Sequence, residues 1–355
     1  MNKKILHLAF LDKFIPGFVD IIDEHFPKEE HTIFSIGDIK KYPYKKSLNS
    51  IHLPTIKNIK GLCSLILELH RSDKVILHGL SSIHITILLC FMPWLHKKLN
   101  WVIWGGDLYY HQLATKNLKF KFVECFRKRL ISRLGGFVTY VDGDYDKVQQ
   151  WYGATGVLYE CIMYKSNVYY GPLLCESITN TSESRGKSEV NIQVGNSADP
   201  TNNHEEVFYK LLKLDAMAKV GKIYCPLSYG NVNYAKKINE LGTGLFGEKF
   251  HPLMDFISLD EYNKVLDDVD IAIFAHKRQQ AMGNIINLLG RGKTVYVRED
   301  TSSYALLKKL RVNILPLSEL SLSVQSCEES FFNNKIIFDY FNEDNLVNQL
   351  KKIFA

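Results

Sequence analysis

The sequence predicts an α/β protein of two domains, each built around a parallel sheet, and three observations predict it. The chain has 355 residues, whereas globular domains usually hold roughly 100 to 200, so two domains are expected. Short apolar runs alternate with helical stretches in both halves, which is the order of βαβ units. Between the halves, residues 176–188 read ESITNTSESRGKS, a composition typical of a solvated linker.

The first domain is expected at residues 1–175. An apolar run, a turn-rich loop and an apolar segment at 18–26 indicate strand, loop and helix. The longest apolar stretch, 75–95, has about the length of a membrane span, but histidines and serines near its start favour a buried strand, a turn at Gly79 and a core helix. The strands expected in this half cover residues 4–10, 75–77, 101–104 and 137–141.

The second domain is expected at residues 189–335 and repeats the pattern of the first. A helix that follows one of its strands is expected to run to about Leu289, where Gly290 ends it. The last residues, 336–355, are expected to form a single C-terminal helix, which could pack on either domain. The strands expected in this half cover residues 190–194, 222–225, 270–274 and 294–297.

The composition excludes several classes of protein. Hydrophobic residues make up 46%, charged residues 23% and aromatic residues 12% of the chain, which argues against a disordered or fibrous protein. A net charge of +6 and a pI near 8.7 favour an anionic partner without choosing among nucleic acid, lipid and nucleotide. The seven cysteines include no C-x-x-C pair, which indicates reduced thiols in the cytosol. The N-terminus has no cleavage site, so no signal peptide is expected.

Residues 116–134 form a basic, aromatic stretch. The sequence KNLKFKFVECFRKRLISRL carries seven Lys or Arg against one Glu. Its apolar residues recur every four positions, at Leu118, Phe122, Phe126 and Leu130. This spacing predicts an amphipathic basic helix. Such a helix either lies on an anionic membrane surface or packs its apolar stripe into the domain core. Nucleic-acid binding is disfavoured because no recognisable binding module accompanies the charge.

Two loops of the second half are candidate phosphate sites. Gly195, Asn196 and Ser197 follow a strand, and a helix is expected from Glu205 onward. Glycine lets a ligand approach the backbone, and a helix N-terminus offers N–H groups to phosphate. The alternative is a plain turn in which Ser or Asn caps the helix.

The second of these loops holds Arg278, Gln279 and Gln280, which follow the strand at 270–274 and are expected at the N-terminus of the next helix. A diphosphate there would gain the helix dipole and a bidentate guanidinium. The same groups would stabilise charge on a departing nucleotide, so no metal is required in principle. The alternative is that all three are exposed loop residues.

Candidate catalytic residues lie in the first half. The Asp107 carboxylate follows a strand and could deprotonate an acceptor hydroxyl, or it could be a helix N-cap. Trp104 and Tyr109 flank it and offer stacking faces for a sugar. His78, at the end of another strand, is the rival base, with a purely structural role as its alternative.

With these segments in hand, the chain resembles the bacterial TDP-4-acetamido-4,6-dideoxygalactose (Fuc4NAc) transferases of glycosyltransferase family 56, which elongate the lipid-linked intermediate of enterobacterial common antigen. The resemblance is ordered and covers nearly the whole chain. Its motifs are His78-Gly79, I-W-G-x-D-L-Y at 103–109, V-G-N-S-x-D at 194–199 with Asn203-His204, Pro226 with Tyr229, F-x-x-x-R-Q-Q-x-x-G at 274–283, and Arg298-Glu299.

The resemblance implies a GT-B fold, in which two Rossmann-like domains face a central cleft, with the acceptor mainly on the first and the donor mainly on the second. It implies transfer of a 4-amino- or 4-acetamido-4,6-dideoxyhexose from a dTDP-sugar to an undecaprenyl-diphosphate-linked saccharide of common antigen or O-antigen. The enzyme would be peripheral on the cytoplasmic face of the bacterial inner membrane, with no cofactor. The implied donor-binding residues are Gly195, Asn196, Ser197, Tyr229, Arg278, Gln279, Gln280, Gly283, Asn284 and Glu299, and the implied acceptor-binding residues are Trp104, Gly105 and Tyr109.

Two other functions remain open at this point. A GT-B sugar-nucleotide epimerase would use the same two domains without an acceptor, and a scaffold protein would bind the nucleotide sugar without turnover. The basic stretch at 116–134 favours the transferase, because an epimerase needs no membrane.

Overall fold

The computed structural model describes residues 3–45, 49–56, 59–174, 189–214 and 216–355. The chain divides into two compact units, of which unit 1 comprises Met1–Val168 and Glu343–Ala355 and unit 2 comprises Tyr169–Asn342. The linker predicted at 176–188 lies outside the described residues.

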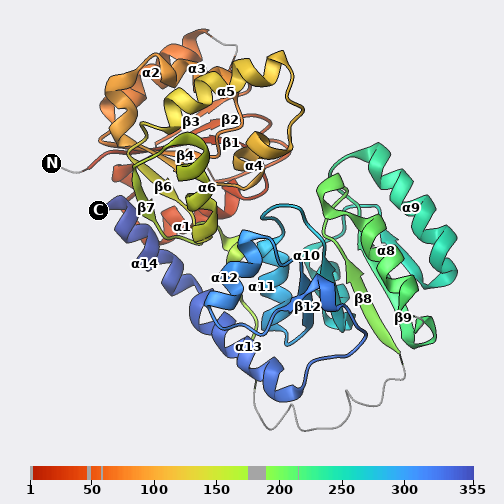
Figure 1. The fold of residues 1–355 in the computed structure, drawn as a ribbon. Helices are drawn as coiled ribbons and strands as arrows, with labels where there is room; N and C mark the ends of the chain where they lie inside the picture. Colours follow the sequence, from red (N-terminus) through yellow and green to blue (C-terminus); the bar gives the residue numbers. More distant parts are fainter. Residues whose placement is uncertain (1–2, 46–48, 57–58, 175–188, 215) are drawn as a thin grey trace. The chain divides into compact units, whose positions relative to one another are not determined.

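Unit 1 is a doubly wound α/β unit around a parallel sheet of order β3-β2-β1-β4-β5-β6-β7. The strands are β1 Ile5–Phe10, β2 His31–Ile36, β3 Ser50–Leu53, β4 Lys74–His78, β5 Leu99–Val102, β6 Gly136–Val138 and β7 Val157–Tyr159. The helices are α1 Ile15–His25, α2 Ile59–Arg71, α3 Ile83–Cys90, α4 Gly106–Leu113, α5 Leu118–Ile131, α6 Asp142–Tyr152 and α14 Glu343–Phe354 (Figure 1).

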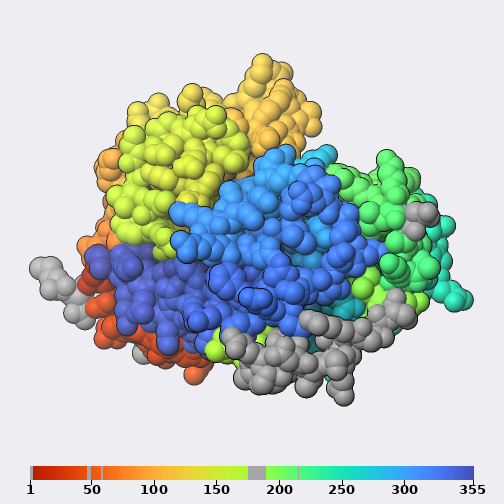
Figure 2. All heavy atoms as spheres, turned by 60° about the horizontal axis from the view of Figure 1, so that its bottom comes forward, coloured from red at the N-terminus to blue at the C-terminus, as the bar shows by residue number. Residues whose placement is uncertain are grey.

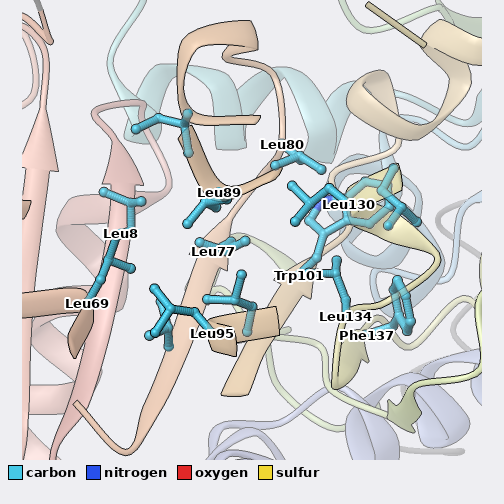
Figure 3. Packing of buried hydrophobic residues seen from close by; sticks show 14 of the residues in the cluster. Leu8, Leu69, Leu77, Leu80, Leu89, Leu95, Trp101, Leu130, Leu134 and Phe137 are labelled. Atoms are coloured by element: carbon cyan, nitrogen blue, oxygen red, sulfur yellow. The ribbon is translucent and has the colours of Figure 1, made fainter. Parts of the chain in front are cut away.

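The core of unit 1 lies between its sheet and its helices. Leu8 and Leu77 project from neighbouring strands toward Leu89 and Leu69 of the covering helices (Figure 3). Strands buried on both faces are apolar almost throughout, which explains why the sequence showed continuous apolar runs instead of alternation. The stretch 75–95 is β4, a turn and α3, as predicted.

Unit 2 repeats this design around a parallel sheet of order β10-β9-β8-β11-β12-β13. The strands are β8 Val190–Val194, β9 Val220–Pro226, β10 Phe250–Leu253, β11 Ile271–Phe274, β12 Thr294–Val297 and β13 Leu315–Pro316. The helices are α8 His204–Lys213, α9 Val232–Phe246, α10 Leu259–Asp268, α11 Met282–Gly290, α12 Ser302–Lys309 and α13 Cys327–Tyr340.

The strand order of each sheet reverses beside its first strand, between β1 and β4 in unit 1 and between β8 and β11 in unit 2. In open α/β sheets, ligands bind beyond the carboxyl ends of the strands at such a switch point. The loops that follow β4, β8 and β11 are therefore placed where a ligand is expected.

The single C-terminal helix predicted at 336–355 is wrong, because two helices occupy this region. Helix α13 starts earlier than predicted, at a capping box formed by Ser326 and Glu329. It ends where the Phe341 backbone leaves the helical region and the Asn342 side chain donates to the carbonyl groups of the last turn.

The second of the two helices, α14, belongs to unit 1. Its Phe354 ring packs on His31 and Phe26, with ring centroids 4.7 Å and 5.0 Å away. Figure 2 shows this dark-blue segment against the red N-terminal part of the chain. Among the described residues, no helix has the length and apolar character needed to cross a bilayer.

Candidate functional site

The candidate donor site lies at the carboxyl ends of β8 and β11, which pair directly through Val194 and Ile273. Gly195 follows β8 with φ of 67°, a conformation that favours glycine. A Cβ atom there would lie 2.6 Å from Nε2 of His204 and 2.7 Å from Oδ1 of Asn202. The glycine is therefore required both by its backbone and by its neighbours.

A buried amide and imidazole network fixes the loop after β8. Oδ1 of Asn202 accepts hydrogen bonds from the backbone N–H of Asn196 at 2.9 Å and from Nε2 of His276 at 2.9 Å. Burial, with the nearby charge of Arg278 adding to it, lowers the pKa of His276 to about 3. His276 is therefore neutral near pH 7 and carries its proton on Nε2, where it serves as a donor.

Arg278 is held in place by Asp199. Its guanidinium donates to the Asp199 carboxylate at 3.1 Å and to the carbonyl oxygen of Gln279 at 3.1 Å, and its side chain is only 14% exposed. Burial raises the pKa of Asp199, but hydrogen bonds from Thr201 and the charge of Arg278 outweigh it and bring the pKa below its usual value. The guanidinium has five N–H donors, so several remain for a ligand.

Gln280 joins the two loops. Its Oε1 accepts from the Thr201 hydroxyl at 2.8 Å, and its Nε2 donates to Oδ1 of Asn196 at 3.3 Å and to Oγ of Ser197 at 3.4 Å. The structure thus brings together Asn196, Ser197 and Gln280, which the sequence singled out separately.

The sequence predicted that residues 278–280 form the helix N-terminus. The structure instead places them in the loop before the helix. Helix α11 begins at Met282, and Ala281 before it adopts a left-handed conformation with φ of 61° and makes no side-chain cap. A left-handed residue stops the helix from extending backward. The first N–H groups of α11, including those of Gly283 and Asn284, therefore have no capping side chain and can donate hydrogen bonds to an anion.

Two tyrosines flank this polar cluster. The Tyr229 hydroxyl accepts from Nδ2 of Asn196 at 2.8 Å, and the Tyr262 hydroxyl donates to Oδ1 of Asn284 at 3.1 Å. Burial raises the pKa of Tyr262 above its ordinary value, with Tyr229 contributing, so Tyr262 is a neutral donor. Sequence reasoning missed Tyr262, which comes from a distant helix.

Other residues of the donor-site network were also missed as functional. Asn202 and His276 stood inside segments that carried other candidates, so polar side chains within those motifs were the available signal.

Glu299 follows the next strand, β12, and is exposed. A hydrogen bond from Ser318 is the main cause that lowers the pKa of its carboxyl. Because β12 pairs with β11 in parallel through Val297 and Phe274, Glu299 lies at the same edge of the sheet as the Arg278 loop.

In unit 1, Asp107 is a structural carboxylate by its contacts. The residue is 5% exposed. Oδ2 accepts from the backbone N–H of Leu80 and the indole of Trp101, each at 2.8 Å, while Oδ1 accepts from the backbone N–H of Trp104 at 3.0 Å and that of Leu108 at 2.9 Å. This geometry favours a structural role over a catalytic base. Asp107 is not the N-cap, however, because it is the second residue of α4 and Gly105 is the N-cap.

His78 lies in the interior of unit 1 and bonds through both ring nitrogens. Nδ1 lies 2.8 Å from the Tyr164 hydroxyl, and Nε2 lies 3.2 Å from Nδ1 of His7, whose Nε2 lies 2.9 Å from Nδ1 of His31. Burial lowers the pKa of His78 to about 3. The contacts again favour the structural alternative, because a base needs a free nitrogen that faces substrate.

Trp104 and Tyr109 differ in their exposure. Trp104 is half-buried, with its indole N–H donating to the Tyr164 hydroxyl at 2.8 Å. Tyr109 is 2% exposed and donates to Asp144 at 2.9 Å, so it offers no open stacking face. Gly105, between them, has φ of 78° and turns the chain into α4.

Arg127 braces these loops, a role that the sequence did not reveal. Its side chain is 4% exposed. The guanidinium donates to the carbonyl oxygens of Leu80 and Asp107, each at 2.7 Å, and pairs with Glu124 at 2.9 Å. The loops that follow β4 and β5 are thus tied together by one buried cation and one buried carboxylate, that of Asp107.

The sequence matches a known protein family, and the fold is similar to that of known structures. The sequence matches the family model described as 4-alpha-L-fucosyltransferase, glycosyl transferase group 56, over residues 13–323. The fold is similar to that of HepE from Anabaena, in a complex with UDP and glucose, with a TM-score of 0.67, 11% identity and 99% of each chain covered. WaaG, a glycosyltransferase involved in lipopolysaccharide biosynthesis, gives a TM-score of 0.61 at 10% identity, covering 99% of this chain and 98% of its own.

A glycosyltransferase from Rickettsia africae gives a TM-score of 0.63 at 13% identity, covering 100% of this chain and 98% of its own. These likenesses show the GT-B fold, with a parallel-sheet α/β unit in each half. The family match spans most of the sequence and takes in every candidate residue of both units. The protein is a glycosyltransferase, and it belongs to glycosyltransferase family 56.

Proposed function

We propose that this glycosyltransferase moves a 4-amino- or 4-acetamido-4,6-dideoxyhexose from a dTDP-sugar to an undecaprenyl-diphosphate-linked saccharide in bacterial surface polysaccharide synthesis. The family description names a fucosyl group, which is itself a 6-deoxyhexose, and this supports a deoxy sugar. HepE binds UDP-glucose, which supports a nucleoside-diphosphate donor. The acceptor and the cytoplasmic face of the inner membrane as its place follow from the family resemblance.

One observation carries the donor assignment, namely Arg278, fixed by Asp199 in the loop that leads to the uncapped N-terminus of α11. A guanidinium and a row of free N–H groups together match a diphosphate in charge and geometry. As the bond to the sugar breaks, negative charge grows on the diphosphate, and donors that are already in place stabilise it without reorganising. Asn196, Ser197, Gln280 and Tyr229 would line the same site, and Glu299 would bind a hydroxyl of the ribose or the sugar.

The reaction is proposed to need no metal ion, because Arg278 and the α11 N-terminus supply the positive charge at the leaving group. Turnover that persists in EDTA is the expected result. Activity that disappears with EDTA and returns with Mg²⁺ would overturn this part of the proposal.

In unit 1, Trp104 is proposed to contact the acceptor, since it is half-buried and stands in the loop after β5. Gly105 would let the acceptor approach the backbone. Asp107 and His78 would hold this loop in position instead of removing the proton.

The decisive experiment compares Arg278→Ala with wild type in transfer from dTDP-sugars to lipid-linked acceptors in bacterial membrane extracts. Loss of one charge-stabilising group at a leaving group lowers kcat by about 10²- to 10³-fold. Lys236→Ala serves as the matched control, because Lys236 is an exposed cation on α9. Near-normal turnover in Arg278→Ala, with an unchanged circular dichroism spectrum, would reject the assignment.

A further inference from the structure

The outer face of α5 carries apolar side chains that the fold leaves in solvent. The stripe predicted from Leu118, Phe122, Phe126 and Leu130 recurs every four residues, and four residues turn an α-helix by about 400°. Each step therefore moves about 40° around the axis. The stripe begins on the solvent side, with Leu118 82% and Phe122 56% exposed, and ends in the core, with Leu130 0% exposed.

These side chains continue into an aromatic row that ends beside the neighbouring helix, α3. The Phe122 ring lies 5.0 Å from that of Phe126, which lies 6.3 Å from that of Phe91, the residue directly after α3. Phe91 is 70% exposed. Helices α3 and α5 pack side by side on unit 1 (Figure 1). The exposed apolar residues thus form one continuous area and not isolated surface positions.

The exposed charged residues of 116–134 all have one sign. Between residues 116 and 134, the sole acidic residue is Glu124. It is turned inward, with its side chain 12% exposed and bonded to His111 and Arg127. Arg127 is buried as well. We call the α3–α5 surface the set of exposed residues Phe91, Leu118, Lys119, Lys121, Phe122, Lys128 and Arg129.

We infer that the α3–α5 surface docks unit 1 on an anionic phospholipid bilayer, with the apolar side chains entering the boundary between headgroups and acyl chains and the cations resting on the lipid phosphates. Apolar side chains flanked by Lys and Arg are the pattern of a helix that lies in the membrane interface. Each cation near such a surface strengthens binding roughly fivefold. The inference rests on the proposed function only for the reason that the enzyme would meet a membrane, where its acceptor is anchored.

The test measures co-sedimentation of the full chain with vesicles of phosphatidylethanolamine and phosphatidylglycerol, and with vesicles of phosphatidylcholine alone. We expect binding to the anionic vesicles, weakened by added salt, and little binding to phosphatidylcholine. The double variant Leu118→Ser/Phe122→Ser is expected to lose roughly tenfold or more in binding, because both apolar insertions are removed. Lys121→Glu/Lys128→Glu is expected to lose at least as much.

Unit 2 offers a matched control pair. Phe256 and Leu259 are exposed to 81% and 73%, but Asp255, Asp260 and Glu261 surround them in sequence. Phe256→Ser/Leu259→Ser removes as much exposed apolar surface and is expected to leave vesicle binding unchanged. All these residues are exposed, so the variants should keep the wild-type circular dichroism spectrum, which also checks that they fold.

Several outcomes would overturn the inference. These are equal binding to both kinds of vesicle, unchanged binding in either α5 variant, or a nucleic acid that competes with vesicles at equal affinity. Vesicle binding needs neither donor nor acceptor, so failure of the two proposals can be told apart. Vesicle binding without sugar transfer keeps the surface and loses the proposed function, and transfer without vesicle binding does the reverse.

Discussion

The buried histidines of unit 1 make its stability depend on pH. His7, His31 and His78 form one hydrogen-bonded chain, and burial lowers the pKa of His78 to about 3 and that of His31 to about 4. Below an unfolded pKa near 6.5 the unfolded chain takes up protons that the folded chain refuses. The free energy of unfolding is therefore highest above about pH 6.5 and decreases as the pH drops toward the folded pKa values. His78 alone accounts for a loss of about 3 kcal/mol at pH 4.

Urea unfolding followed by tryptophan fluorescence measures this, since Trp94, Trp101, Trp104 and Trp151 all lie in unit 1. The urea concentration at the unfolding midpoint is expected to decrease as the pH is lowered from 7 to 4.5. His78→Gln should flatten that fall, whereas His84→Gln, at an exposed histidine, should not. A midpoint that is constant over this range would contradict the prediction.

Arg127 is expected to be the costliest cation to remove from unit 1. Arg127→Met would leave Glu124 without its buried cation and remove the guanidinium hydrogen bonds to the carbonyl groups of Leu80 and Asp107. Breaking a buried pair from one side costs about 3–5 kcal/mol. The neighbouring Lys128 is exposed, so Lys128→Met should change the free energy of unfolding by less than about 0.5 kcal/mol. Equal urea midpoints for the two variants would show that Arg127 does not brace the loops.

Sequence reasoning selected residues that the structure places together, but it did not describe their contacts. It selected Asn196, Ser197 and Gln280 from two separate loops, because parallel strands bring such loops to one edge of the sheet. It could not find the inward direction of Arg127, because that depends on the angle at which α5 meets the sheet. It also offered Asp107 and His78 as bases, since a polar residue at a strand end looks alike in sequence whether or not neighbouring donors occupy it.

At the scale of elements, Gly195 decides whether the β8 loop can form. Gly195→Ala would strain a left-handed backbone and press a methyl group against His204 and Asn202. We expect a loss of about 1–3 kcal/mol in stability together with weaker nucleotide binding. Gly244 is the control, because it lies within α9 and a Cβ there meets nothing within 4 Å. Gly244→Ala should stabilise the protein by about 0.5–1 kcal/mol. Normal nucleotide binding by Gly195→Ala would contradict the site.

Most of the buried strands were predicted, but the buried strand β2 and the short edge strands were not. β1, β4, β8 and β12 appeared as apolar runs because they lie inside their sheets. The edge strands β3 and β7 are short and half-exposed, so they lack that signal. The start of α11 was misplaced because nothing in the sequence marks Ala281 as left-handed, a conformation uncommon for alanine.

At the scale of the whole molecule, no sequence pattern indicated which unit the last helix would join. The choice depends on a hydrophobic site in unit 1, where the Phe354 ring meets His7, His31 and Phe26. Residues from opposite ends of the chain meet there, and their distance in sequence hides the contact. Unit 1 is thus completed only after unit 2 has been synthesised.

The two units should respond differently to the donor nucleotide. If dTDP binds at Arg278, it stabilises unit 2, by about 2.7 kcal/mol at a concentration 100 times its Kd. Because every tryptophan lies in unit 1, fluorescence reports on unit 1, whereas circular dichroism reports on both units. We therefore expect dTDP to raise the Tm measured by circular dichroism more than the Tm measured by fluorescence. UDP should shift it less and GDP least, and Arg278→Ala should abolish the shift. A shift confined to fluorescence would place the nucleotide in unit 1, and a preference for GDP would reject the thymidine donor.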